Sequence, residues 1–155
     1  MIKKIIAGTL LSSLTLFALP NNELELVILS KVIEKKAVVL SNMGLSGETK
    51  SNFGKLYDEY QTKLMKHRVT ELKLIENYAT NYNNLTNDKA NELLKTWVTA
   101  EDSAAVLKKD YIAKFKKVMS AADVIRYFQI ENRLQLRSEV AKASLIPLAQ
   151  PAETK

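Results

Sequence analysis

Acidic residues stand side by side at two places in the chain, an arrangement that general acid–base catalysis could use. The two pairs are Asp58–Glu59 and Glu101–Asp102. Adjacent positions on a helix point in different directions, so neither pair converges on one substrate atom. Catalysis would also need a pocket that shifts the carboxyl pKa values. We therefore expect solvated helix faces at both pairs and no catalytic residue.

The chain has few residues that could bind a metal ion or act as a nucleophile. His67 is the only histidine, and the chain has no cysteine. A transition-metal site would have to be built from carboxylates and one imidazole without clustered ligand spacing. No nucleophile elbow, phosphate loop or dinucleotide fingerprint occurs. The residues predict neither an enzyme nor a site for a metal or cofactor.

Tyrosines are the first candidate for a binding surface. Four of them follow the helical spacing of the apolar residues: Tyr57, Tyr60, Tyr78 and Tyr82. A tyrosine ring is apolar, whereas its hydroxyl prefers a wet edge. We expect these residues at the core and rim of a helical bundle, and the alternative is that some of them line an adaptable binding face.

A polar stripe is the second candidate. Its residues lie three or four positions apart and therefore share one face of a helix. They are Arg126, Gln129, Arg133 and Arg137. The stripe could meet acidic residues of a dimer partner or acidic clients, and a plain solvated face is the alternative.

Composition predicts the elements that must carry these residues. The chain has 155 residues, enough for one domain, with only 4 Gly and 3 Pro. Few turn residues beside abundant Ala, Leu, Lys and Glu favour long helices over a sheet. The formal net charge is +6, but no dense basic run occurs, and Lys114, Lys116 and Lys117 suit a helix C-terminus. We expect an all-α protein that does not bind nucleic acid.

The N-terminus predicts export. Lys3 and Lys4 precede an uncharged, largely apolar stretch from Ile5 to Leu19, which is short for crossing a bilayer. Residues 1–20 therefore resemble a signal peptide, and an uncleaved anchor is the alternative. The lack of cysteine excludes a lipoprotein anchor. We expect a periplasmic protein with a helical domain over 21–148 and a flexible tail over 149–155.

Four helices are expected in that domain. Apolar spacing and breakers predict them at about Glu23–Ser41, Glu48–Tyr82, from Thr86 to about Val118, and from Ser120 to near Leu145. Gly44 and Gly47 supply the freedom for the first break. The second helix would be ~50 Å long at 1.5 Å per residue, which predicts an elongated four-helix bundle with one long central helix pair.

Three of the helices share a type of start. An apolar residue precedes Ser or Thr at Leu45–Ser46, Leu85–Thr86 and Met119–Ser120. The hydroxyl caps N–H groups of the first turn, and the apolar side chain packs back as a hydrophobic staple. Asp123 follows Ser120 by three residues and completes an approximate capping box.

A family resemblance follows from these starts. Leu45-Ser-Gly-Glu-Thr49 and Leu85-Thr-Asn-Asp-Lys89 resemble the paired Leu-Thr-x-x-Gln helix starts of the Spy/CpxP (LTXXQ) family of periplasmic helical proteins, although both lack the Gln. A longer resemblance links the chain to small secreted proteins of Gram-negative bacteria that look like distant relatives of that family. It is carried by Leu56-Tyr-Asp-Glu-Tyr-Gln61, Asn77-Tyr-Ala-Thr-Asn-Tyr82, Tyr111-Ile-Ala-Lys-Phe-Lys-Lys-Val118, Arg126-Tyr-Phe-Gln-Ile-Glu-Asn-Arg-Leu134 and Ile146-Pro-Leu148.

The resemblance implies a helical-hairpin fold that forms a curved antiparallel dimer, with a concave surface that holds unfolded clients without ATP. We accordingly expect a periplasmic, ATP-independent chaperone-like or envelope-stress binding protein that acts through an amphipathic helical surface. Its partners would be a second copy of the chain and non-native proteins, and a membrane only if the N-terminal segment stays uncleaved. The alternative is a regulatory or structural protein that binds one defined envelope partner, such as the periplasmic domain of a sensor.

Overall fold

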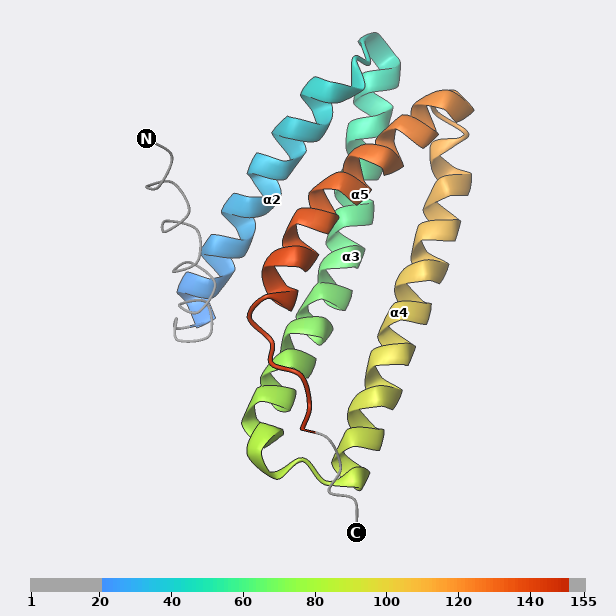
Figure 1. The fold of residues 1–155 in the computed structure, drawn as a ribbon. Helices are drawn as coiled ribbons and strands as arrows, with labels where there is room; N and C mark the ends of the chain where they lie inside the picture. The colour runs from blue at the N-terminus through green and yellow to red at the C-terminus, as the bar shows by residue number, and fades with distance from the viewer. Residues whose placement is uncertain (1–20, 151–155) are drawn as a thin grey trace, which may run out of the picture. The chain divides into compact units, whose positions relative to one another are not determined.

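The computed structural model describes residues 21–150, with side chains from residue 31 onward, and within that range it is all-α, as expected. The helices are α2 (Asn21–Met43), α3 (Gly47–Asn81), α4 (Asn87–Phe115) and α5 (Ala121–Ala143), with a short 3₁₀ helix, η2 (Tyr82–Asn84), between α3 and α4 (Figure 1). No strand occurs in this range. The expected signal peptide at 1–20 and the tail end at 151–155 lie outside the described residues. No helix within 21–150 is long and apolar enough to cross a membrane.

The predicted break after the first helix is confirmed. The Ser41 hydroxyl and the Asn42 side-chain amide both donate to the Val38 carbonyl, at 2.9 and 2.8 Å, and thereby satisfy a carbonyl of the last turn of α2. Gly44 and Gly47 have φ values of 65° and 55°, in the left-handed region that glycine adopts without strain. The chain divides here into two compact units, with the boundary in the sequence between Gly44 and Leu45.

The three helices of the second unit start, as predicted, after Ser46, Thr86 and Ser120. Not all three hydroxyls accept a hydrogen bond from the first turn. Thr86 and Ser120 each accept a hydrogen bond from the backbone N–H three residues on, at 3.2 Å from Lys89 and 3.1 Å from Asp123. Ser46 occupies the same position but makes no side-chain capping bond, so the cap predicted there is wrong. Gly47, the first residue of α3, takes a left-handed φ, and the first turn therefore departs from the geometry in which a serine hydroxyl reaches its N–H groups.

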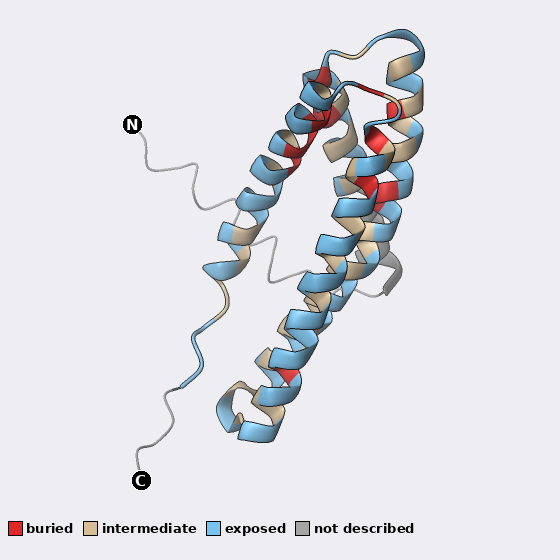
Figure 2. Cartoon of the chain, turned by 90° about the vertical axis from the view of Figure 1, so that its right-hand side faces the viewer, coloured by how far each residue is buried: buried red, intermediate tan, exposed pale blue. Residues whose placement is uncertain are grey.

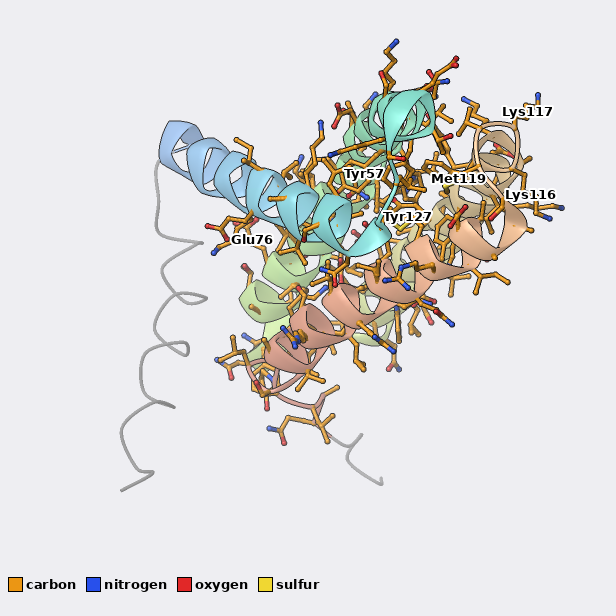
Figure 3. The ribbon with its side chains drawn as sticks, turned by 90° about the horizontal axis from the view of Figure 1, so that it is seen from above. Tyr57, Glu76, Lys116, Lys117, Met119 and Tyr127 are labelled. Atoms are coloured by element: carbon orange, nitrogen blue, oxygen red, sulfur yellow. The ribbon has the colours of Figure 1, made fainter. Side chains whose placement is uncertain are left out.

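Aromatic rings from three helices form the core of the second unit. Phe115 of α4 and Tyr127 of α5 have ring centroids 4.9 Å apart, and Phe53 of α3 lies 5.2 Å from Tyr127. These separations are typical of favourable tilted and edge-to-face ring pairs. The aromatic core comprises Phe53, Tyr57, Tyr60, Tyr111, Phe115, Tyr127 and Phe128. Figure 2 shows buried residues where these helix segments meet, and Figure 3 shows Tyr57 and Tyr127 among them.

Helices α3 and α4 run side by side in opposite directions (Figure 1), yet apolar packing between them becomes sparse away from the aromatic core. Leu93 is buried, whereas Leu94, Trp97 and Val98 are about half exposed. Successive helix residues are rotated by ~100°, so Leu94 and Val98 point well away from the direction of Leu93. The buried face of α4 is therefore narrow in this part of the helix.

Candidate functional site

Two of the four candidate tyrosines belong to the core and not to a binding surface. Tyr57 and Tyr60 are only 1% and 4% exposed. Tyr60 packs against Tyr111 at 5.0 Å between ring centroids, and Tyr57 lies 6.0 Å from Tyr127. A residue held in this way inside the unit cannot contact a client or a second copy of the chain. Their burial agrees with the expectation that they lie in the core and not with the alternative that they line a binding face.

A small polar cluster lies within the aromatic core. The Gln61 side-chain amide donates to the Tyr127 hydroxyl at 3.3 Å and to the Glu131 carboxylate at 3.1 Å. The Tyr57 hydroxyl is buried and has no hydrogen-bond partner in the described part of the chain. Burial, followed by the nearby charge of Glu131, raises the pKa of Tyr127 and also raises the pKa of Tyr60 to about 12. These hydroxyls therefore stay protonated at neutral pH and are poorly suited to accept a proton from a substrate.

A second polar cluster, on the edge of the core, centres on Glu59. Its Oε1 atom accepts hydrogen bonds from the Tyr111 hydroxyl at 2.5 Å, from Lys114 Nζ at 3.0 Å and from Lys63 Nζ at 3.2 Å. The Tyr111 bond, followed by those of Lys114 and Lys63, lowers the pKa of Glu59 to about 2. Lys114 Nζ also lies 4.4 Å from the centroid of the Tyr111 ring. Lys114 of the predicted basic cluster therefore ties α4 to α3, while Lys116 and Lys117 point outward (Figure 3).

The other two candidate tyrosines, Tyr78 and Tyr82, bind residues that follow the last helix. Tyr78 and Tyr82 form an edge-to-face pair with ring centroids 5.9 Å apart. The Tyr78 hydroxyl donates to the Pro147 carbonyl at 2.9 Å, and the Gln150 side-chain amide donates to the Tyr82 hydroxyl at 3.0 Å. Partial burial of its hydroxyl raises the pKa of Tyr78. Both tyrosines thus contact residues 147–150 in addition to each other.

The predicted arginine stripe lies on the surface of α5. Arg126, Gln129, Arg133 and Arg137 are all exposed. Large aliphatic side chains share this face, because helix residues three or four positions apart point the same way. Ile125, Leu136 and Val140 are 61%, 63% and 63% exposed. We call the seven residues together the α5 surface stripe.

Part of this stripe was missed by sequence reasoning. The sequence analysis identified the polar residues of the stripe but none of its aliphatic neighbours, Ile125, Leu136 and Val140. The positions of Leu136 and Val140, three and seven residues beyond Arg133, would have identified them as neighbours of the arginines. The face turned to the core is instead marked by Val124, Phe128 and Glu131, which are buried.

An open hollow of about 420 Å³ lies between the middle parts of α3 and α4. Lys66, His67 and Thr70 line it from α3, and Lys95, Thr96, Thr99, Ala100 and Ser103 line it from α4. Four of its hydroxyls, including those of Thr70 and Ser103, donate to backbone carbonyls four residues earlier in their own helices. The only histidine therefore faces a polar part of the helix pair.

The two carboxylate pairs do not converge with other acids or with histidine. Glu59 is bonded to basic and phenolic side chains, and Glu101 Oε1 accepts from Trp97 Nε1 at 2.9 Å. Within the described residues, no group of three or more His, Cys, Asp or Glu side chains is arranged to hold a metal ion. What the described surface offers is a combination of exposed apolar and basic side chains suited to binding.

Comparisons with known proteins do not assign the chain to a family. No family model, no curated protein and no solved structure matches it.

Proposed function

We propose that this protein is a periplasmic, ATP-independent chaperone-like or envelope-stress binding protein whose α5 surface stripe contacts non-native clients. The observation that carries the proposal is the exposure of Ile125, Leu136 and Val140, each above 60%, on one helix face with three arginines. Exposed apolar side chains on the same helix face as arginines can bury apolar area and make hydrogen bonds with a bound segment.

The chemistry of the stripe suits weak contacts with many sequences. Full burial of a side chain such as Leu or Ile is worth about 1.5–3 kcal/mol, so partial burial of three of them gives modest affinity. Arginine side chains add hydrogen bonds to carboxylates or carbonyl groups and present flat apolar surfaces as well. Such a surface can release a client after folding because no single contact dominates.

Other expectations from the sequence belong to this proposal. They are export by residues 1–20, the helical-hairpin arrangement with a concave surface, the antiparallel homodimer and the relationship to the Spy/CpxP family. The antiparallel neighbours α3 and α4, and the apolar-Ser/Thr pair that precedes each of three helices in this chain, support the hairpin part. Helices of 35 and 29 residues also provide a surface long enough for an extended client.

Aggregation of a denatured model substrate tests the proposal. Purified residues 21–155 should suppress light scattering at a near-stoichiometric ratio. The triple variant Ile125→Gln, Leu136→Gln, Val140→Gln should lose most of this effect, since glutamine keeps the helix but removes the apolar contacts.

A matched control is available on α4. Leu94, Val98 and Val106 are also half or more exposed, and their triple replacement by Gln should leave suppression unchanged. If both triple variants lose aggregation suppression equally, the α5 surface stripe is not the client-binding surface. If the wild-type protein does not suppress aggregation under several conditions, the protein is not a chaperone. Crosslinking in cells that captures one dominant folded partner would favour the regulatory alternative.

A further inference from the structure

Residues 147–150, which have no regular secondary structure, lie against the end of α3 and the start of η2 and are held there by side-chain hydrogen bonds. Pro147 and Gln150 contact Tyr78 and Tyr82 respectively, at 2.9 and 3.0 Å. Between these two contacts the Leu148 side chain is 89% exposed, so apolar packing there adds little. The attachment therefore depends on the two tyrosine hydroxyls and on the partly buried Leu145 and Ile146.

Tyr78 and Tyr82 together form a pair of rings and hydroxyls that can bind an extended segment. They are four residues apart, one turn of helix, and their rings pack edge to face at 5.9 Å. One hydroxyl donates to a backbone carbonyl and the other accepts from a side-chain amide three residues further along the segment. With one hydroxyl donating and the other accepting, as in this structure, the pair favours one direction and register of the bound segment.

The segment has the properties of a ligand for such a pair. Proline holds φ near −65° and lacks an N–H, so residues around it stay extended without needing a backbone partner. Aromatic surfaces with hydrogen-bonding groups are a common way of binding extended proline-containing segments, because little conformational entropy is lost on binding. The chain supplies Pro147-Leu-Ala-Gln150, with the bonded carbonyl on the proline and the bonded amide on the glutamine.

We propose that Tyr78 and Tyr82 form a binding site for an extended Pro-x-x-Gln segment of another protein, which the chain's own residues 146–150 occupy and thereby regulate. The tether gives the internal segment a high effective concentration, so an external segment competes only when it is abundant or when the internal one is released. This site is separate from the α5 surface stripe and does not depend on the chaperone proposal.

The test uses the full chain and a fluorescein-labelled peptide that copies residues 144–151. Gln150→Ala removes the amide bonded to Tyr82, and Pro147→Gly keeps the carbonyl but makes the segment more flexible when it is free, so the double change should release it. Fluorescence anisotropy should then show peptide binding at least about tenfold tighter than to the wild-type protein, because the internal competitor is gone. Adding Tyr78→Phe and Tyr82→Phe should reverse that gain, since both hydroxyls are lost while the rings remain.

A control peptide and a second measurement test whether the binding depends on the proposed contacts. A peptide with the proline and glutamine changed to Gly and Ala should not bind the released protein. In the otherwise wild-type chain, the two Tyr→Phe changes should raise the backbone mobility of residues 146–150 in ¹⁵N relaxation. No gain in peptide binding after release, or binding that survives the loss of both hydroxyls, would overturn the proposal.

Discussion

Glu59 shows how one exposed carboxylate can join two helices. It accepts hydrogen bonds from Tyr111 and Lys114 of α4 and from Lys63 of its own helix. The bonds favour the charged form, and the pKa of Glu59 falls to about 2. At the residue scale this carboxylate has a structural role, and the same contacts leave it unavailable as a catalytic base.

The lowered pKa predicts an acid-dependent stability. The unfolded chain takes up the proton near the ordinary glutamate pKa of 4.5, whereas the folded chain takes it up only near 2. The stabilisation is therefore complete above about pH 5 and is lost as the pH falls toward 2. Glu59→Gln should lower Tm at pH 7 and make the difference from wild type shrink between pH 5 and pH 2, as followed by circular dichroism.

The control for this effect is Glu76→Gln, an exposed glutamate on the same helix. It should leave both Tm and its pH dependence close to those of the wild-type protein. A Glu59→Gln variant whose Tm differs from wild type by the same amount at every pH would contradict the assigned role of the carboxylate.

At the scale of the elements, a Ser or Thr before a helix marks where the helix starts, but its side chain does not always make the capping hydrogen bond. Ser46, Thr86 and Ser120 all occupy the residue before a helix in extended backbone geometry. Only Thr86 and Ser120 accept the backbone hydrogen bond, since α3 begins with a glycine in the left-handed region. The sequence pattern located the start of each helix correctly but did not determine the hydrogen bond.

This difference predicts unequal costs for three equivalent substitutions. Thr86→Ala and Ser120→Ala should each destabilise the protein by ~1 kcal/mol, the usual value of an N-terminal cap. Ser46→Ala should change the free energy of unfolding by less than about 0.5 kcal/mol, as expected for a surface position without such a bond. Urea unfolding measures all three, and a loss at Ser46 equal to that at Thr86 would show that its hydroxyl caps the helix in solution.

At the scale of the whole molecule, association with a second copy is part of the proposed function. The α5 surface stripe carries three arginines, and acidic residues such as Asp88 and Glu92 are exposed on α4. Opposite charges of this kind could meet across two copies, and two-fold symmetric dimers are the commonest oligomers.

Light scattering coupled to gel filtration tests this association directly. Residues 21–155 should elute with twice the mass of one chain, and Arg133→Glu should shift the population toward the single-chain mass at low protein concentration. Lys55→Glu, an equal charge reversal at an exposed position of α3, should not. A single-chain mass for the wild-type protein at high concentration would refute the dimer.

The sequence by itself determined the all-α class, the approximate bounds of four helices and the breaks between them. These features depend on local physics: the scarcity of Gly and Pro, the spacing of apolar residues, and the Ser or Thr before each of three helices. Such signals act within a few residues of one another, so they can be read without knowing which helix lies beside which.

Only the tertiary structure decided which side of each helix is covered. It placed Tyr57 and Tyr60 in the core, left Ile125 and Val140 on the surface beside the arginines, and brought Pro147 to Tyr78 from 69 residues away. An apolar stripe in the sequence shows that a helix has a side to bury, but its width and direction depend on the rings that neighbouring helices contribute. The candidate binding surfaces are the helix sides that remain exposed after packing, so they can be identified only from the packed structure.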